Sequence, residues 1–283
     1  MKWQIIPTGR VWVDPGGAFG LVPRSLWEKH QIPNHNNLIP MDLNSLLVQT
    51  AGKIILIDTG IGEKLSDKAA GQWGLEWPEG SLLKNLAANG ISPEDVDIVI
   101  DTHLHSDHCG GNTVRLEDRV APAFPNAEYF VQRIEFAEAY NSNSRTRATY
   151  LPENFIPLWE AGQLTLLNGN TEIVPGVRCE VTRGHTRGHQ SIIIEDRDGP
   201  VLFVSDLASY AAHFIRAAWV AAYDVEPQET IASKEIWQAW ALEQNARLVF
   251  QHDTVTRMGR LQRNVDGRLG MELLAEGSLG NTR

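Results

Sequence analysis

The sequence predicts an α/β protein, because strand-like and helix-like segments alternate along the chain. An apolar hairpin at 45–57 is followed by a helix at 81–88 and then by the apolar strand 98–100. Strands that alternate with helices in this way are typical of a sheet covered by helices. Continuous apolar runs at 192–194 and 201–204 predict two further core strands in the second half of the chain.

The N-terminal part holds two expected strands and one segment without a clear pattern. Residues 3–6 and 10–13 predict short strands separated by a Pro-Thr-Gly tripeptide. Residues 14–43 are rich in Gly, Pro and Asn, so we expect an irregular segment there. Long irregular segments are often functional, and this one is expected to be a flap over a site or a homodimer arm, with an ordinary surface connection as the alternative.

The next elements have recognisable boundary signals. The strands at 45–50 and 53–57 are joined by an Ala-Gly pair, which favours a hairpin turn. The helix at 81–88 has Ser81 as a candidate N-cap and an apolar stripe that includes Leu82 and Leu86.

Strand and helix signals alternate again beyond residue 120. Residues 128–131 predict a strand and 132–140 a helix, and the polar segment 141–154 is expected to be mobile. Further strands are expected in the second half, near 163–167, 171–174, 177–182, 191–195 and 201–205.

A long helix and a last strand complete the predicted elements. Residues 228–243 predict a helix, and residues 247–250 predict the last strand. The Gly-rich residues 267–283 are expected to form a flexible tail. The helix should turn one apolar face to the core, made of Ile231, Ile236, Trp237 and Trp240.

A polar loop directly after the strand 98–100 carries the strongest functional signal. It places His103, His105, Asp107 and His108, four side chains that can bind metal, within six residues. In a continuing strand the first two histidines would share a face and reach one ion. The other two follow where the chain turns and can reach a second ion. Imidazole and carboxylate suit zinc, and also manganese or iron.

This loop, His-x-His-x-Asp-His after an apolar strand, resembles the signature of the metallo-β-lactamase-fold hydrolases. Other segments that resemble motifs of this family occur in the family's order over residues 45–255: Leu56–Gly60, Gly184–His189, Phe203–Asp206 and Phe250–Asp253. The resemblance implies a single domain over residues 1–283. It also implies a four-layer αββα sandwich built from two strand–helix halves.

The resemblance further implies a set of ligands for two divalent metal ions, zinc first, with Mn²⁺ or Fe²⁺ as alternatives. His103, His105 and His185 would bind one ion, Asp107, His108 and His252 the other, and Asp206 would bridge them beside a shared hydroxide. Asp58 is expected to brace the loop rather than to bind metal, and His189 is expected to be structural.

Two side chains are expected to act on the substrate. Asp107 can protonate the leaving group, and Tyr210 is the candidate to stabilise the oxyanion, with Tyr223 behind it. Packing against neighbouring residues is the alternative role for either tyrosine.

The resemblance is to the branch of acyl-homoserine lactonases and related organophosphate hydrolases, which share the run at 184–191, here with Arg187 where Pro is common. It implies a hydrolase that opens a lactone or cleaves another neutral ester of small size. Thioester or phosphoester hydrolysis is the alternative, and a di-iron oxidoreductase is a further one. Dinuclear β-lactamases generally have Cys or Ser at the position of Asp206, which disfavours β-lactam hydrolysis.

Composition restricts the partners and the location. The formal net charge of −10 over 283 residues argues against nucleic acid as the main partner. The most apolar stretch, 211–223, is interrupted by His213 and Arg216 and is too short to span a bilayer, so no membrane is expected. The two cysteines make no disulfide framework, and the N-terminus shows no secretory pattern. We therefore expect a cytoplasmic enzyme.

Overall fold

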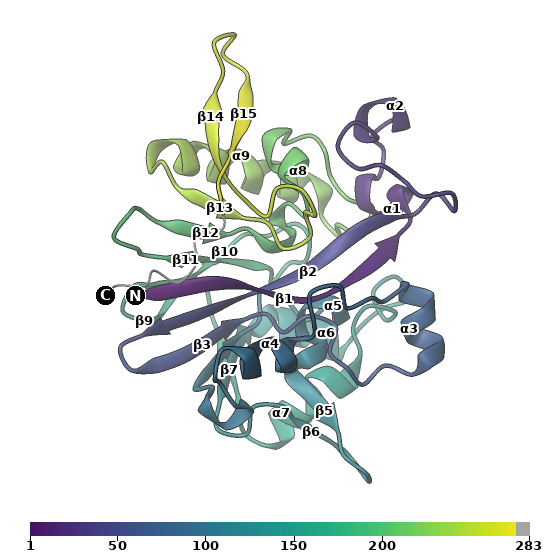
Figure 1. Cartoon of the computed structure of the whole chain (residues 1–283), viewed down its shortest axis with the longest axis vertical. Coiled ribbons are helices and arrows are strands. Elements are labelled where there is room, and N and C mark those ends of the chain that lie inside the picture. Colours follow the sequence, from purple (N-terminus) through teal and green to yellow (C-terminus); the bar gives the residue numbers. More distant parts are fainter. Residues whose placement is uncertain (276–283) are drawn as a thin grey trace. The chain divides into compact units, whose positions relative to one another are not determined.

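The structure is a computed structural model that describes residues 1–275. The chain forms two compact units, which are unit 1 (residues 1–10 and 43–169) and unit 2 (residues 11–42 and 170–275). The predicted α/β class is confirmed, since strands of a sheet are joined by helices in both units (Figure 1). The organisation of the chain as a single domain stays a prediction.

The first sheet has six strands in the order β1-β2-β3-β4-β7-β8. The strands β2 and β3 pair antiparallel, whereas each of the neighbouring pairs from β3 to β8 is parallel. The strands are β1 (Lys2–Val13), β2 (Ile39–Thr50), β3 (Lys53–Ile57), β4 (Ile98–Ile100), β7 (Glu128–Gln132) and β8 (Leu164–Leu167). A separate small hairpin pairs β5 (Thr113–Arg115) with β6 (Val120–Pro122).

Of two predictions made for this sheet, one is confirmed and one was wrong. The predicted hairpin is present, and its turn residues Ala51 and Gly52 have φ of 50° and 75°, as a tight hairpin turn needs. The prediction of two short strands before residue 14 was wrong, because β1 continues through Pro7. Since β1 is at the edge of the sheet, a residue without an N–H group is tolerated there.

Helices of unit 1 pack against this sheet through one apolar core. Leu82 and Leu86 of α4 lie in this core with Val99 of β4 and Ala139 of α6. The helices predicted over 81–88 and 132–140 are thus confirmed, one residue shorter at the start. The helical elements of unit 1 are α3 (Asp67–Trp73), α4 (Leu82–Ala88), η1 (Pro93–Asp95), α5 (Ser106–Cys109), η2 (Gly110–Asn112), α6 (Arg133–Tyr140), η3 (Pro152–Asn154) and α7 (Ile156–Glu160).

The second sheet has seven strands in the order β15-β14-β13-β12-β11-β10-β9. All neighbouring strands are antiparallel except β12 and β13, which run parallel. The strands are β9 (Thr171–Val174), β10 (Val177–Val181), β11 (Gln190–Ile194), β12 (Val201–Phe203), β13 (Arg247–Val249), β14 (Met258–Arg263) and β15 (Leu269–Leu273).

The predicted flexible tail needs a correction. Within residues 267–283, the strand β15 pairs with β14 over five residues, in the yellow hairpin at the top of Figure 1. Gly267 (φ 79°) makes the turn, and Leu269 and Met271 pack on the core of unit 2, which gives this part of the segment a reason to be ordered. The remainder of the predicted tail, 276–283, lies outside the described residues.

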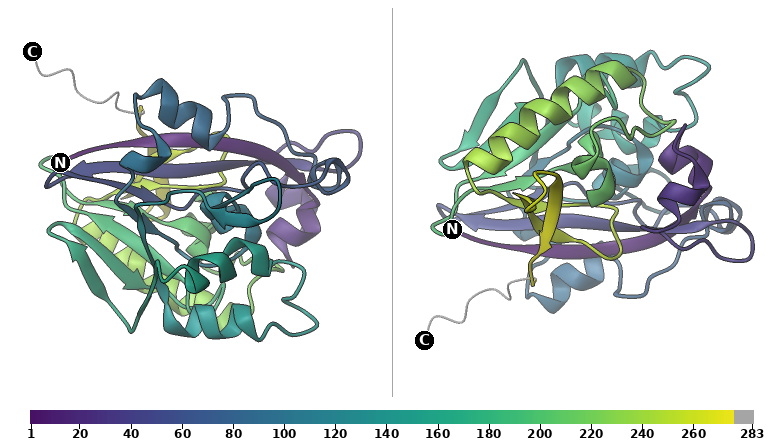
Figure 2. Two further views of the ribbon diagram at one scale, coloured as in Figure 1. Left: turned by 90° about the horizontal axis from the view of Figure 1, so that it is seen from below. Right: turned by 90° about the horizontal axis from the view of Figure 1, so that it is seen from above.

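Helix α9 covers one face of the second sheet (Figure 2, right, light green). The helix was predicted correctly, and Trp237 and Trp240 pack on the core as expected, but Ile236 of the predicted core face is 66% exposed. The side chains that α9 buries are Thr230, Lys234 and Ala241, at helical spacing, with Trp237 and Trp240 half-buried beside them. The helical elements of unit 2 are α1 (Pro15–Phe19), α2 (Arg24–Trp27), η4 (Ser205–Leu207), α8 (Ala211–Ile215) and α9 (Pro227–Glu243).

The segment 14–43 is more regular than expected. It contains α1 and α2 and then enters β2, and the rings of Phe19 and Trp27 stack with centroids 5.5 Å apart. Both rings are buried, which explains why this segment is ordered. Its role as a flap or a dimer arm stays a prediction. Among the described residues, no helix combines the length and the apolar character that crossing a bilayer requires.

Candidate metal centre

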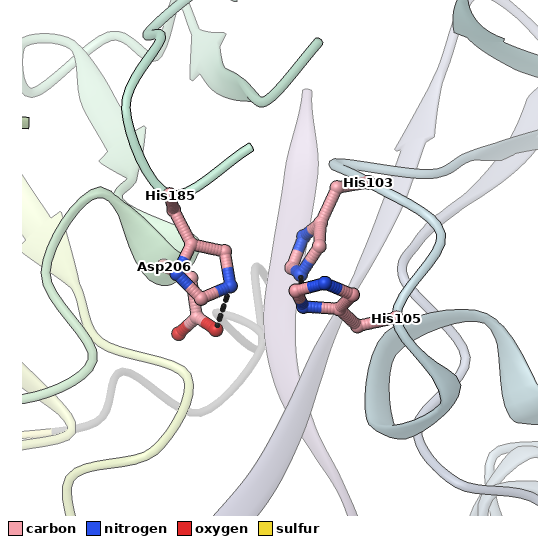
Figure 3. Close-up of side chains that lie close together, drawn as sticks. All are labelled: His103, His105, His185 and Asp206. Carbon is pink, nitrogen blue, oxygen red and sulfur yellow. Dashed lines mark hydrogen bonds and ion pairs between the residues drawn. The ribbon is translucent and has the colours of Figure 1, made fainter. Parts of the chain in front are cut away.

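Unit 1 brings together the four side chains of the predicted metal loop. The strand β4 ends at Ile100 and the chain bends at Thr102. His105 has an extended backbone at the start of α5, and α5 then carries Asp107 and His108. All four side chains are buried. Nε2 of His103 lies 3.0 Å from Nδ1 of His105, and the two rings meet edge-on with an interplanar angle of 79° (Figure 3).

Asp58 braces this loop from the end of β3, as the sequence predicted. One of its carboxylate oxygens lies 2.9 Å from Nδ1 of His108, and the carboxylate accepts hydrogen bonds from the amide and the hydroxyl of Thr102. Asp58 has a φ of 56°, a left-handed conformation that costs free energy in a residue with a side chain. The contacts of Asp58 with Thr102 and His108 compensate this cost. They hold Nδ1 of His108, so Nε2 is the nitrogen suited to bind a metal.

A second brace comes from α6 and from the segment that follows it, and the sequence did not reveal it. Glu135 is fully buried, and its Oε1 accepts from the amide of Leu104 at 3.0 Å and from the hydroxyl of Tyr150 at 2.9 Å. The Tyr150 ring lies 5.0 Å from the ring of His105, and the amide of Ser106 donates to the carbonyl of Thr149. The segment 141–154, expected to be mobile, is therefore tied to the metal loop at its C-terminal end.

Unit 2 brings together the three remaining predicted ligands. Because β12 and β13 are parallel neighbours, the residues that follow them meet at one edge of the sheet. Asp206 and His252 lie there, and His185 comes from the adjacent connection between β10 and β11. Nε2 of His185 lies 3.0 Å from Oδ2 of Asp206, drawn as a dashed line in Figure 3, and Nε2 of His252 lies 3.2 Å from Oδ1.

The other ring nitrogen of His185 and of His252 is also held by the protein. Nδ1 of His185 lies 2.9 Å from a carboxylate oxygen of Asp224, and Nδ1 of His252 lies 2.8 Å from the carbonyl oxygen of Asp42. Burial alone would lower the pKa of His185, but the two carboxylates beside it outweigh burial and raise its pKa to about 10. This part of unit 2 therefore strongly favours positive charge.

The donor set fits divalent metal ions. Fixing Nδ1 of His108, His185 and His252 leaves Nε2 of each as the electron-pair donor, as in other proteins where a carboxylate or carbonyl orients a metal-binding histidine. Imidazole nitrogen and carboxylate oxygen are ligands that zinc and related ions prefer. The described chain thus carries His/Asp clusters suited to divalent metals.

Both predicted tyrosines pack against neighbours. Tyr210 is buried, its ring stacks on Phe19 at 5.5 Å, and its hydroxyl lies 3.4 Å from the carbonyl oxygen of Pro40. Tyr223 is 41% exposed, and its hydroxyl occupies the space that a side chain on Gly17 would need. The oxyanion role stays a prediction.

Two further residues of the Gly-His-Thr-x-Gly-His segment contact other parts of the protein and are not assigned as metal ligands. Nδ1 of His189 contacts the hydroxyl and the carbonyl oxygen of Thr182, which agrees with the structural role expected for this histidine. The guanidinium of Arg187 pairs with Glu226 at 2.7 Å.

Comparisons with known proteins agree with this description. Residues 39–252 match the Metallo-beta-lactamase superfamily. An N-acyl homoserine lactonase from Bacillus sp is 30% identical over 237 residues, covering 80% of this chain and 83% of the relative. A solved structure of a probable metal-dependent hydrolase from Staphylococcus aureus is 30% identical, with a TM-score of 0.85 and 98% of each chain covered. A structure of an N-acyl homoserine lactone hydrolase, with the product N-hexanoyl-L-homoserine at its catalytic metal center, is 25% identical, with a TM-score of 0.70 over 89% of this chain and 93% of that one.

The chain belongs to the metallo-beta-lactamase superfamily, because the match covers most of its length. Within that superfamily it is a metal-dependent hydrolase with lactonase relatives. The predicted family and fold are thereby confirmed.

Proposed function

We propose that this protein hydrolyses the ring of N-acyl homoserine lactones with the help of two divalent metal ions, zinc in the first place. The observation that carries the proposal is the contact of Asp206 with two histidines, one at each carboxylate oxygen. A carboxylate shared in this way is suited to bridge two ions. The lactonase relatives at about 30% identity support the choice of substrate.

The proposed centre has seven ligands, divided between two ions. The first ion takes His103, His105 and His185 (Figure 3), the second takes Asp107, His108 and His252, and Asp206 is shared. The burial of these side chains and the fixed Nδ1 atoms of three histidines support this assignment. Bound ions would supply a hydroxide near neutral pH and a Lewis acid for the substrate carbonyl.

Ring opening consumes one water and moves one proton. The lactone carbonyl carbon gains the water oxygen, and its bond to the ring oxygen breaks. One proton of the water is released when the new carboxylic acid ionises, and the other reaches the ring oxygen, which leaves as an alcohol. We assign delivery of the proton to the ring oxygen to Asp107, whose side chain retains 11% exposure in the metal loop.

Tyr210 is proposed to support the oxyanion, because the hydrogen bond from its hydroxyl to the carbonyl oxygen of Pro40 is long, at 3.4 Å. The change Tyr210→Phe keeps the stacked ring. It should lower kcat about tenfold, or more, if the hydroxyl acts on the substrate, and leave kcat unchanged if the residue only packs.

The test is ring opening of N-hexanoyl homoserine lactone by the zinc-loaded protein, followed by proton release, beside a chelated sample. The variant Asp206→Ala should lose turnover and keep its circular dichroism spectrum. Activity that survived this change would refute the shared-carboxylate site. No opening with two zinc ions confirmed would leave the site and move the substrate to thioesters or phosphoesters.

The predicted homodimer and cytoplasmic location are also proposals. Two buried cysteines without a disulfide, Cys109 and Cys179, are compatible with a reducing compartment. Light scattering of the zinc-loaded protein tests the dimer, and cell fractionation tests the location.

A further inference from the structure

Unit 1 contains a cavity of about 230 Å³. None of the proposed metal ligands lines it. Its walls come from β1, the segment after β3, α4 and β5. The apolar part of its wall is formed by Trp77, Leu82, Leu83 and Val114. Positive charge comes from Lys64 and Arg115. The cavity therefore combines an apolar wall with a cationic one.

The ammonium group of Lys64 has unused hydrogen-bonding capacity. Its Nζ donates to the carbonyl oxygen of Gly110, and within residues 1–275 this is the one acceptor that it contacts. An ammonium group carries three N–H donors, so two remain for a ligand. Burial lowers the pKa of Lys64 to about 8, which still leaves the group largely protonated at neutral pH.

The charges around Lys64 favour an anion. Arg115 lines the same cavity and shares only part of its guanidinium with Glu153, at 2.9 Å. Glu63 also lines the cavity, but its side chain is exposed, so water screens its repulsion of an anion. A half-buried ammonium with one neutral partner gains more from a carboxylate than an exposed one does.

The size of the cavity limits the ligand. Pockets for drug-sized molecules have volumes of about 300–1,000 Å³, so a ligand here is smaller. We propose that the cavity binds a short-chain carboxylate, with its anionic end on Lys64 Nζ and its apolar tail against Trp77 and Leu83. This site is separate from the proposed metal centre, and its occupancy does not depend on the reaction.

The test is calorimetric titration of the zinc-loaded protein with hexanoate, beside 1-hexanol as a neutral probe of similar length. A ligand of this size is expected to bind with a Kd of about 1 mM. Lys64→Met should weaken hexanoate at least about tenfold, and 1-hexanol should bind the unchanged protein more weakly than hexanoate. Lys84→Met is the matched control, because Lys84 is exposed on α4 and does not line the cavity.

A second variant keeps the lysine and removes the space. Leu83→Trp fills the cavity from α4 and should also weaken hexanoate, which keeps the test decisive if Lys64→Met does not fold. Carboxylates also bind exposed metal ions, so the titration is repeated after chelation. Heat of binding that disappears with the metal, or that persists unchanged in either cavity variant, would overturn the proposal.

Discussion

Replacing Asp224 by asparagine should weaken metal binding although Asp224 is not itself an assigned ligand. Its carboxylate lies 2.9 Å from Nδ1 of His185, and both side chains are buried. An asparagine oxygen can still accept this hydrogen bond, so only the contribution of the charge is lost. Bonds to charged groups are worth about 1.5–3 kcal/mol and neutral ones about 0.5–1.5 kcal/mol, a difference of about 1–1.5 kcal/mol. We therefore expect Asp224→Asn to weaken the affinity for zinc about tenfold.

The assay is competition for zinc against a fluorescent chelator, with the Kd of each ion determined for the wild type and the variant. Asp198→Asn is the matched control, because it removes the same charge from an exposed turn of the same unit. A zinc affinity of Asp224→Asn within about twofold of the control would refute the reasoning that this contact orients His185. Loss of zinc together with loss of the folded state would be recognised by circular dichroism.

Three further changes test other contacts. Tyr150→Phe removes the hydroxyl that donates to buried Glu135. It should lower the free energy of unfolding, measured in urea, by about 1.5–3 kcal/mol. A smaller loss would argue against the brace. Gly111→Ala would place a methyl group 2.3 Å from the carbonyl oxygen of Thr59. It should destabilise the folded protein by about 2 kcal/mol or more, measured by thermal unfolding. An unchanged midpoint temperature of unfolding would contradict this packing. Burial lowers the pKa of Lys234 to about 8 from 10.5, so the unfolded chain binds the proton more tightly and the free energy of unfolding should rise between pH 8 and pH 10, by up to about 3 kcal/mol. Lys234→Met should lack this rise, and a variant with the same pH dependence as the wild type would refute the assignment.

The parts of the molecule that the sequence predicted are those in which the signal is local. The metal loop is six residues long and follows a short apolar strand, so its residues and its place after β4 were both readable. The brace by Asp58 was also expected, but only through the resemblance of the turn that contains it.

The contacts that the sequence did not reveal join residues far apart in the chain. Asp224 is 39 residues from His185, and Glu135 is 31 residues from Leu104. Neither carboxylate belongs to a sequence motif. The partner of an isolated acidic residue becomes identifiable only once the fold is known. The burial of Lys234 in α9 was missed for a related reason, since its long stem is buried and its ammonium donates to the carbonyl oxygen of Trp219. Hydrophobicity alone assigns such a lysine to the surface.

The three histidines with an oriented Nδ1 differ in how easily a mutation removes the partner of that nitrogen. His108 and His185 each rely on a carboxylate side chain, so a single codon change at Asp58 or Asp224 removes the partner. His252 relies on the backbone carbonyl of residue 42, which every amino acid supplies. Substitutions at that position alter the contact of the Asp42 carboxylate with Arg257 but leave the backbone carbonyl in place. During divergence of the family, the orientation of His252 is therefore protected by backbone geometry, whereas the other two depend on selection to keep an acidic residue.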